Sequence, residues 1–285
     1  MSLLRTSLRD GSARFALRRL RAIRPAAEPA SPAEARDAAG LVRVASYNVH
    51  KCVGRDGKFD PGRVAAVINE IGADVVAVQE ADRRFGRRTG LLDAQLLRDE
   101  GGLCLVPVSD LHDGHGWHGN ALLLRHGEAI RIRRLALPGA EPRGAVIAEL
   151  ALPAGKLRVV AAHFGLLRRC RARQGAAILH ALRDGEPMPT LMMGDLNEWR
   201  PGRRSALRVM EPFFGPLPDG PPSFPTRRPV LALDRILGWP QGLVASVEVH
   251  DSPLARVASD HLPLTARVDL SPNGAVQLCR PADAA

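Results

Sequence analysis

Seven short segments of this sequence place a polar side chain at the end or the start of an apolar run. The stretch "LMMGDLNEW" (residues 191–199) is one of them, with Asp195 and Asn197 two residues apart. Residues i and i+2 of an extended chain point to the same side, and Gly194 is expected to allow a tight turn. A buried carboxylate is costly unless a charged or donating group meets it. The spacing therefore predicts a polar partner at the end of this strand.

The other six segments carry chemically useful side chains in comparable positions. They contain, in chain order, Asn48, Glu80, Asn120, His163, Asp234, and Asp260 with His261. One such residue could cap a helix, but seven segments of this kind predict a shared polar centre.

Three of these residues are oxygen donors that suit a hard cation. Glu80 and Asp260 offer carboxylates and Asn48 offers a neutral carbonyl. Mg²⁺, with Mn²⁺ as the alternative, prefers such ligands and retains several waters, so a small protein ligand set is appropriate. The set predicts a divalent metal site; the structural alternative for Glu80, Asp260 and His261 is a buried salt-bridge network.

The remaining side chains fit hydrolysis. His163 and His261 can donate to a phosphoryl oxygen, and Asp234 can fix the tautomer of a histidine. Asp195 can take a proton from water, while Asn197 holds that water or a phosphate oxygen; an Asx turn is the structural alternative for this pair. Together with a metal, these groups describe attack of water on a phosphate ester.

Strand and helix patterns alternate from residue 41 onward. Helices are predicted at 59–73, with Asp60 as N-cap and Pro61 in the first turn, and at 168–184. Strands are predicted at 41–49, 74–80, 119–125, 128–137, 144–152, 156–164, 189–195, 231–237, 243–249 and 262–270. Many strands with few helices favour packed sheets over a simple doubly wound fold.

In this order the seven segments resemble the endonuclease/exonuclease/phosphatase superfamily, which includes DNase-type nucleases, neutral sphingomyelinases and inositol polyphosphate phosphatases. The resemblance spans roughly residues 41–270. It implies an α/β fold, a four-layer sandwich of two mixed β-sheets packed face to face with helices outside. It also implies a site at the strand ends between the sheets.

The resemblance implies a role for each polar residue. Glu80 resembles the principal Mg²⁺ ligand, assisted by Asn48, with Asp260 as a second carboxylate near the metal. Asp195 and Asn197 resemble the pair that acts on water and phosphate. His261 with Asp234 resembles the histidine–aspartate pair at the scissile phosphate, and His163 resembles a second catalytic histidine. The supporting groups are Asn120, Arg173 and Gln174.

Two departures narrow the branch of the superfamily. The only tyrosine is Tyr47, so the tyrosine-centred motif of the abasic-site repair branch is absent. The Trp-Cys pair typical of inositol phosphatases is replaced by Leu231 and Ala232. The DNase-like and sphingomyelinase-like branches are favoured.

Three regions are expected: a basic Ala/Pro-rich extension (1–40), a catalytic domain (41–270) and a tail (271–285). Residues 1–24 carry seven arginines and one acid, so this segment could rest on a membrane as a basic amphipathic helix. A transit-like leader and a frayed terminus are the alternatives. The net charge of +10 favours polyanions, but only three of the 40 basic residues are lysines, so genome composition could explain the excess.

We therefore expect a Mg²⁺-dependent phosphodiesterase with nucleic acid as the favoured substrate. A phospholipid or sphingomyelin headgroup or an inositol phosphate is the alternative, and an inactive binding module is the reading from another class. No apolar run is long enough to span a membrane, and the four cysteines form no CxxC pair. The expected location is the cytoplasm, peripheral to a membrane if residues 1–24 bind one. No obligate protein partner is inferred.

Overall fold

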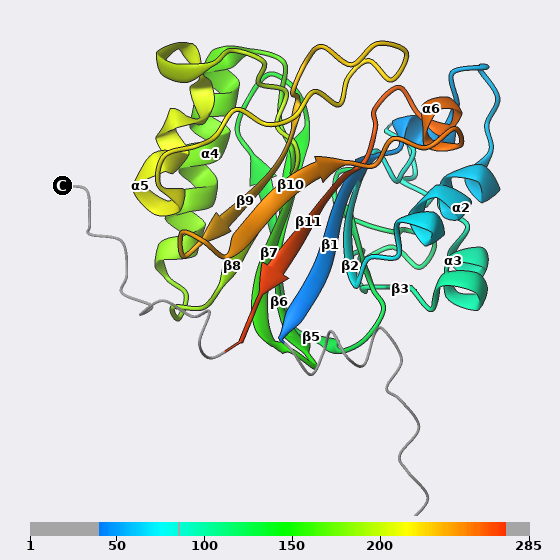
Figure 1. Cartoon of the computed structure of the whole chain (residues 1–285), viewed down its shortest axis with the longest axis horizontal. Helices are drawn as coiled ribbons and strands as arrows, with labels where there is room; N and C mark the ends of the chain where they lie inside the picture. The colour runs from blue at the N-terminus through cyan, green and yellow to red at the C-terminus, as the bar shows by residue number, and fades with distance from the viewer. Residues whose placement is uncertain (1–39, 85, 272–285) are drawn as a thin grey trace, which may run out of the picture.

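Two mixed β-sheets face each other in the computed structural model, which describes residues 40–84 and 86–271 (Figure 1). The first sheet has the strand order β10 (Val244–Val249), β11 (Leu264–Asp269), β1 (Leu41–Asn48), β2 (Val75–Gln79), β4 (Ala121–Leu124) and β3 (Cys104–Leu105). The second has the order β5 (Glu128–Leu137), β6 (Arg143–Leu152), β7 (Gly155–His163), β8 (Thr190–Asp195) and β9 (Asp234–Trp239). The pairs β1–β2 and β7–β8 are parallel, and the other neighbours are antiparallel.

Helices cover the outer face of each sheet. The first sheet packs against α2 (Pro61–Ile71), α3 (Ala94–Gly101) and α6 (Ala255–Ala258). The second packs against α4 (Arg168–Arg183), α5 (Glu211–Phe214) and the 3₁₀ helix η3 (Ala206–Met210). Two shorter 3₁₀ turns are η1 (His50–Cys52) and η2 (Gly202–Arg204). The four layers confirm the predicted sandwich (Figure 1).

The two predicted helices are confirmed as α2 and α4. Helix α2 begins as expected, because an Asp60 carboxylate oxygen accepts a hydrogen bond from the Arg63 N–H at 2.9 Å and Pro61 occupies the first turn. It ends at Gly72, whose φ of 64° is the left-handed conformation that glycine adopts readily. The sequence prediction missed the eight-residue helix α3 and the two-residue strand β3.

The core between the sheets is built from alternate residues of each strand. On β8, Leu191 and Met193 belong to this core, and Asp195 is the next residue on the same face. The same step leads from Ala161 to His163 on β7 and from Ala77 to Gln79 on β2, and on β1 two such steps lead from Val44 through Ser46 to Asn48. The polar centre is therefore the continuation of the apolar inner faces.

Gly194 lies within β8 and does not form the tight turn that the sequence suggested. A Cβ atom at this position would lie 1.8 Å from the carbonyl oxygen of Ala162 on β7, and its φ is 152°. The glycine is required by the close approach of a neighbouring strand. The chain turns later, at Asn197, which has a φ of 51°.

The described residues contain no helix that is both long and apolar enough to cross a bilayer. Almost all of the predicted basic extension and nearly the whole predicted tail lie outside these residues. The expectation that residues 1–24 contact a membrane falls in that part of the chain.

Candidate active site

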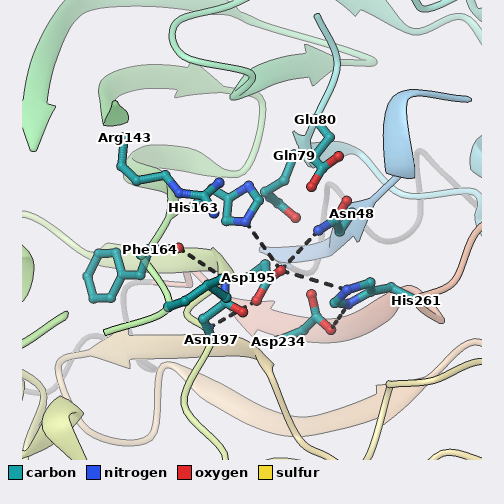
Figure 2. A network of polar contacts seen from close by, with 12 residues as sticks. Asn48, Gln79, Glu80, Arg143, His163, Phe164, Asp195, Asn197, Asp234 and His261 are labelled. Atoms are coloured by element: carbon teal, nitrogen blue, oxygen red, sulfur yellow. Dashed lines mark hydrogen bonds and ion pairs between the residues drawn. The ribbon is translucent and has the colours of Figure 1, made fainter. Parts of the chain in front are cut away.

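Three of the predicted polar residues lie around the carboxylate of Asp195. Asn48 donates to it through Nδ2 at 2.9 Å. The Nε2 atoms of His163 and His261 lie 3.4 and 3.8 Å from the same oxygen. All four side chains are buried, and Figure 2 shows the other three directed at Asp195 from different parts of the chain.

The register of the second sheet sets the spacing of three of these groups. His163 on β7 is paired with Asp195 on β8, which is paired in turn with Asp234 on β9. Paired residues of adjacent strands lie on the same face, and neighbouring strands are about 4.8 Å apart. The backbone ladder thus places a histidine and two carboxylates in one row.

Asp234 holds the ring of His261 in place. Its Oδ2 lies 2.9 Å from Nδ1 of His261 and also accepts a hydrogen bond from the hydroxyl of Ser223. Burial by itself lowers the pKa of His261, but Asp234, together with Asp195 and Asp260, outweighs it and raises the pKa to about 10. His261 is therefore an imidazolium at neutral pH.

The Asp234→Asn variant is expected to lose this cation. Removing the negative charge beside Nδ1 disfavours the imidazolium, so the pKa of His261 should fall from about 10 toward the ordinary value of a histidine. An NMR titration of the metal-free protein measures it: His261 stays protonated at about pH 8 in the parent and is neutral there in the variant. An unchanged titration would show that Asp234 does not set this charge.

His163 is held in the opposite protonation state. Burial lowers its pKa to about 4, with a further contribution from nearby Arg143, and the attraction of Asp195 and Glu80 compensates only in part. A neutral imidazole carries a single N–H, so His163 can offer one hydrogen bond. The site therefore presents one neutral and one cationic imidazole to the same aspartate.

Asn197 forms the Asx turn that was the structural alternative for it, and it also lies at the active-site cavity. Its backbone N–H donates to the second carboxylate oxygen of Asp195 at 3.0 Å, which is an Asx turn. Its side-chain amide donates to the Phe164 carbonyl at 3.0 Å, and the residue also lines the cavity described below. The turn thus fixes the Asp195 carboxylate and leaves Asn197 at the cavity wall (Figure 2).

The three predicted metal ligands line one cavity of about 400 Å³, together with Asp195 and His261. Glu80 adopts the left-handed backbone conformation, with a φ of 57°, and its carboxylate lies 2.5 Å from Lys51 Nζ. Burial raises the pKa of Glu80, but electrostatic interactions with His163 and Lys51 and the hydrogen bond from Lys51 outweigh it, so the pKa lies below its ordinary value.

The Asn48 side-chain carbonyl accepts from the His50 N–H at 3.1 Å and retains a second lone pair. The carboxylate of Asp260 lies 3.9 Å from His50 and is partly exposed. Two carboxylates and one amide oxygen facing one cavity fit an oxygen-preferring cation such as Mg²⁺.

A second cluster, formed by Asp195, Asp234 and His261, has potential ligand atoms within 4.8 Å of one another. Its histidine is cationic, so without a metal the cluster is a hydrogen-bonded ion pair.

The model of the Endonuclease/Exonuclease/phosphatase family matches residues 45–261, a range that includes every polar residue of this site. The chain belongs to this family. The superfamily resemblance found in the sequence is thereby confirmed. No curated protein was found to match by sequence.

Solved structures of this family share the fold. A family protein from Beutenbergia cavernae is 24% identical, with a TM-score of 0.61 over 81% of this chain and 72% of its own. TDP2 of D. rerio, solved with a single-strand DNA product, is 16% identical, with a TM-score of 0.58 over 80% of this chain and 98% of its own. The human Nocturnin catalytic domain, solved with a bound sulfate anion, is 18% identical, with a TM-score of 0.56 over 80% and 94%.

The predicted supporting residues of this family member are only partly brought to the site. Asn120 bridges the sheets, since its amide donates to the carbonyl of Gly144 at 3.0 Å. Gln174 accepts from the Gly165 N–H at 2.8 Å and so holds the turn after β7. Arg173 is exposed on α4, and no described contact joins it to the site residues. Arg173 therefore lies on a solvated face of α4.

The arginine that does support the turn after β7 is Arg171, which the sequence prediction missed. It is fully buried, pairs with Glu198 at 3.2 Å and donates to the carbonyls of Gly165 and Leu166. A signal was present, because residues 171, 174 and 178 share one face at helical spacing. Ser223, which donates to Asp234, and Arg143, which lies near His163, carried no comparable signal.

Proposed function

We propose that this chain is a metal-dependent phosphodiesterase that hydrolyses a phosphate ester by in-line attack of water. The observation that carries the proposal is the Asp195 carboxylate, met by an amide and two imidazoles at the wall of an open cavity. Membership of a family of nucleases and phosphatases supports the reaction class. A binding module that lost its chemistry is disfavoured because all the expected polar residues are retained.

Asp195 is the group that takes a proton from water in this mechanism. Its two oxygens are fixed by the Asn48 amide and the Asn197 backbone, so the carboxylate is oriented before substrate arrives. A positioned general base contributes about 10²–10⁴-fold to a rate.

The two histidines act on the phosphate. Cationic His261 offers charge and a proton at Nε2, and neutral His163 offers a hydrogen bond at the same wall. Such fixed donors stabilise the negative charge of a phosphoryl transition state, because they need no reorganisation during the reaction. A divalent cation held by Glu80, Asn48 and Asp260 would polarise the phosphoryl group.

The glutamate can be tested by metal binding alone. Glu80→Ala is expected to weaken Mn²⁺ binding by more than about tenfold, because a hard cation loses a carboxylate ligand. Calorimetric titration of the metal-free protein measures this, and Glu100→Ala is the matched control because Glu100 is exposed on α3. Equal affinities in the two variants would remove Glu80 from the ligand set.

The choice of substrate is tested by parallel assays. Mg²⁺-dependent hydrolysis is measured on plasmid DNA, sphingomyelin, phosphatidylinositol phosphates and the soluble diester bis(p-nitrophenyl) phosphate, with Glu80→Ala as the inactive control. The net charge of +10 favours a polyanionic substrate, which nucleic acid and an anionic lipid surface both present. A TDP2 of similar fold was solved with a single-strand DNA product. Absence of metal-dependent hydrolysis of every diester would overturn the proposal.

A further inference from the structure

Bulky apolar side chains are exposed around the mouth of the active-site cavity. Nine large hydrophobic residues are exposed in the described part of the chain, and four of them gather in three loops near this mouth: Leu166, Leu167, Trp199 and Val230, with exposed fractions between 42% and 61%. We call residues 166–169, 199–204 and 227–231 the collar. Such a gathering on a protein surface marks an interaction site more often than scattered apolar residues do.

The collar surrounds the chemistry directly. Leu166, Trp199 and Leu231, one from each loop, line the same cavity as Asp195 and His261. These loops follow β7, follow β8 and precede β9, the three strands whose register places the row of catalytic groups. Whatever contacts the collar is therefore held against the mouth of the site.

Arginines accompany the apolar residues in all three loops, and acidic residues are absent from the collar. The arginines are Arg168, Arg169, Arg200, Arg203, Arg204, Arg227 and Arg228. Across the described chain, Arg169, Arg203, Arg227 and Arg228 have no carboxylate within ion-pairing distance, whereas many arginines elsewhere are paired, as Arg158 is with Glu149. The collar thus offers positive charge to a partner.

Part of the collar is held in place before any partner binds. Two guanidinium groups lie over the Trp199 ring, with Cζ of Arg171 5.1 Å and Cζ of Arg200 4.9 Å from its centroid. Arg168 donates to the carbonyl of Arg204 at 2.9 Å and so ties two of the loops together. The exposed ring is accordingly supported by cation–π contacts.

We propose that the collar docks the active-site mouth onto an anionic lipid surface, so that the diester reaching the site is a lipid headgroup. Leucine and valine side chains can enter the acyl boundary of a bilayer, tryptophan favours the interface, and arginines attract anionic headgroups. Three of the four exposed apolar residues are aliphatic and cannot stack on bases as a nucleic-acid platform requires. The choice of substrate rests on the proposed hydrolysis, whereas the docking does not.

The test measures binding without turnover. The full chain carrying Asp195→Asn is co-sedimented with vesicles of phosphatidylcholine and phosphatidylglycerol, and with vesicles of phosphatidylcholine alone. In this background Leu167→Ser with Val230→Ser is expected to weaken binding to the anionic vesicles by about tenfold or more. Ile130→Ser is the matched control, because Ile130 is similarly exposed on β5 and does not line the site cavity. Residues 1–39 are present in every protein compared, and thermal melting verifies that each is folded.

The outcomes separate this inference from the proposed function. Unchanged vesicle binding in the collar variant, or an equal loss in the Ile130→Ser control, overturns the docking. Collar-dependent binding of single-stranded DNA with no collar-dependent binding of vesicles overturns the lipid assignment in favour of nucleic acid. Hydrolysis of bis(p-nitrophenyl) phosphate by the parent chain is assayed separately, so collar-dependent docking without that hydrolysis would count against the proposed function alone.

Discussion

Asp195→Asn is expected to lower kcat by about two to four orders of magnitude while leaving the protein folded. An asparagine retains the size of the side chain and one carbonyl oxygen for the Asn48 amide, but it cannot take a proton from water. It also removes the negative charge that both histidines face at 3.4 and 3.8 Å. Steady-state hydrolysis of a soluble phosphodiester with saturating Mg²⁺ measures the effect.

Asp99→Asn provides the matched control for this substitution. Asp99 is exposed on α3, and losing its charge should leave the rate unchanged. Thermal melting of both variants shows whether the fold is intact. Full hydrolysis by a folded Asp195→Asn protein would remove Asp195 from the mechanism.

Arg171→Leu is expected to reduce the free energy of unfolding by about 3–5 kcal/mol, because it removes the buried cation of Glu198 and leaves the partly exposed Arg200, at 4.0 Å, as the remaining ion-pair partner. The side chains of Arg171 and Glu198 are fully buried. Glu198 also accepts from the N–H groups of Arg200 and Ala206, at 2.9 and 2.7 Å, so it anchors the loop after β8. Urea denaturation followed by circular dichroism measures the loss.

The same helix supplies the comparison for this prediction. Arg173→Leu replaces an exposed arginine two residues away and should change the free energy of unfolding by less than about 0.5 kcal/mol. Similar losses in the two variants would mean that helix propensity or net charge governs stability here, rather than the buried ion pair.

Much of the fold could be predicted because local patterns agree with the final structure. Strands β1 and β8 alternate between two apolar environments, the core between the sheets and the core under the helices, so long apolar runs ending in polar residues were visible. Helix α2 carried its cap and its glycine stop in the sequence. Helix α3 and strand β3 are too short for periodicity to identify them.

The residue types of the site could be predicted from the sequence, but the residues that hold the site in place could be predicted only in part. Asn48, Asp195 and His261 meet as expected, because each extends an inner face or a loop beside it. Which arginine of α4 turns inward depends on the rotation of that helix against the sheet, and this rotation is a property of packing. The sequence prediction assigned Gly194 to a tight turn. The structure requires a glycine there because β7 approaches closely, and this strand is distant in sequence.

His163, Asp195 and Asp234 are paired across β7, β8 and β9, so their side chains share one face only while the number of residues in each strand is kept. Successive side chains of a strand face opposite ways, so deleting one residue from β8 would turn its carboxylate toward the helices and bring a neighbour to the cavity. Loops can lengthen or shorten during evolution without this penalty. Related chains should therefore differ freely in loop length, while these three strands tolerate changes of residue type far better than changes of residue number.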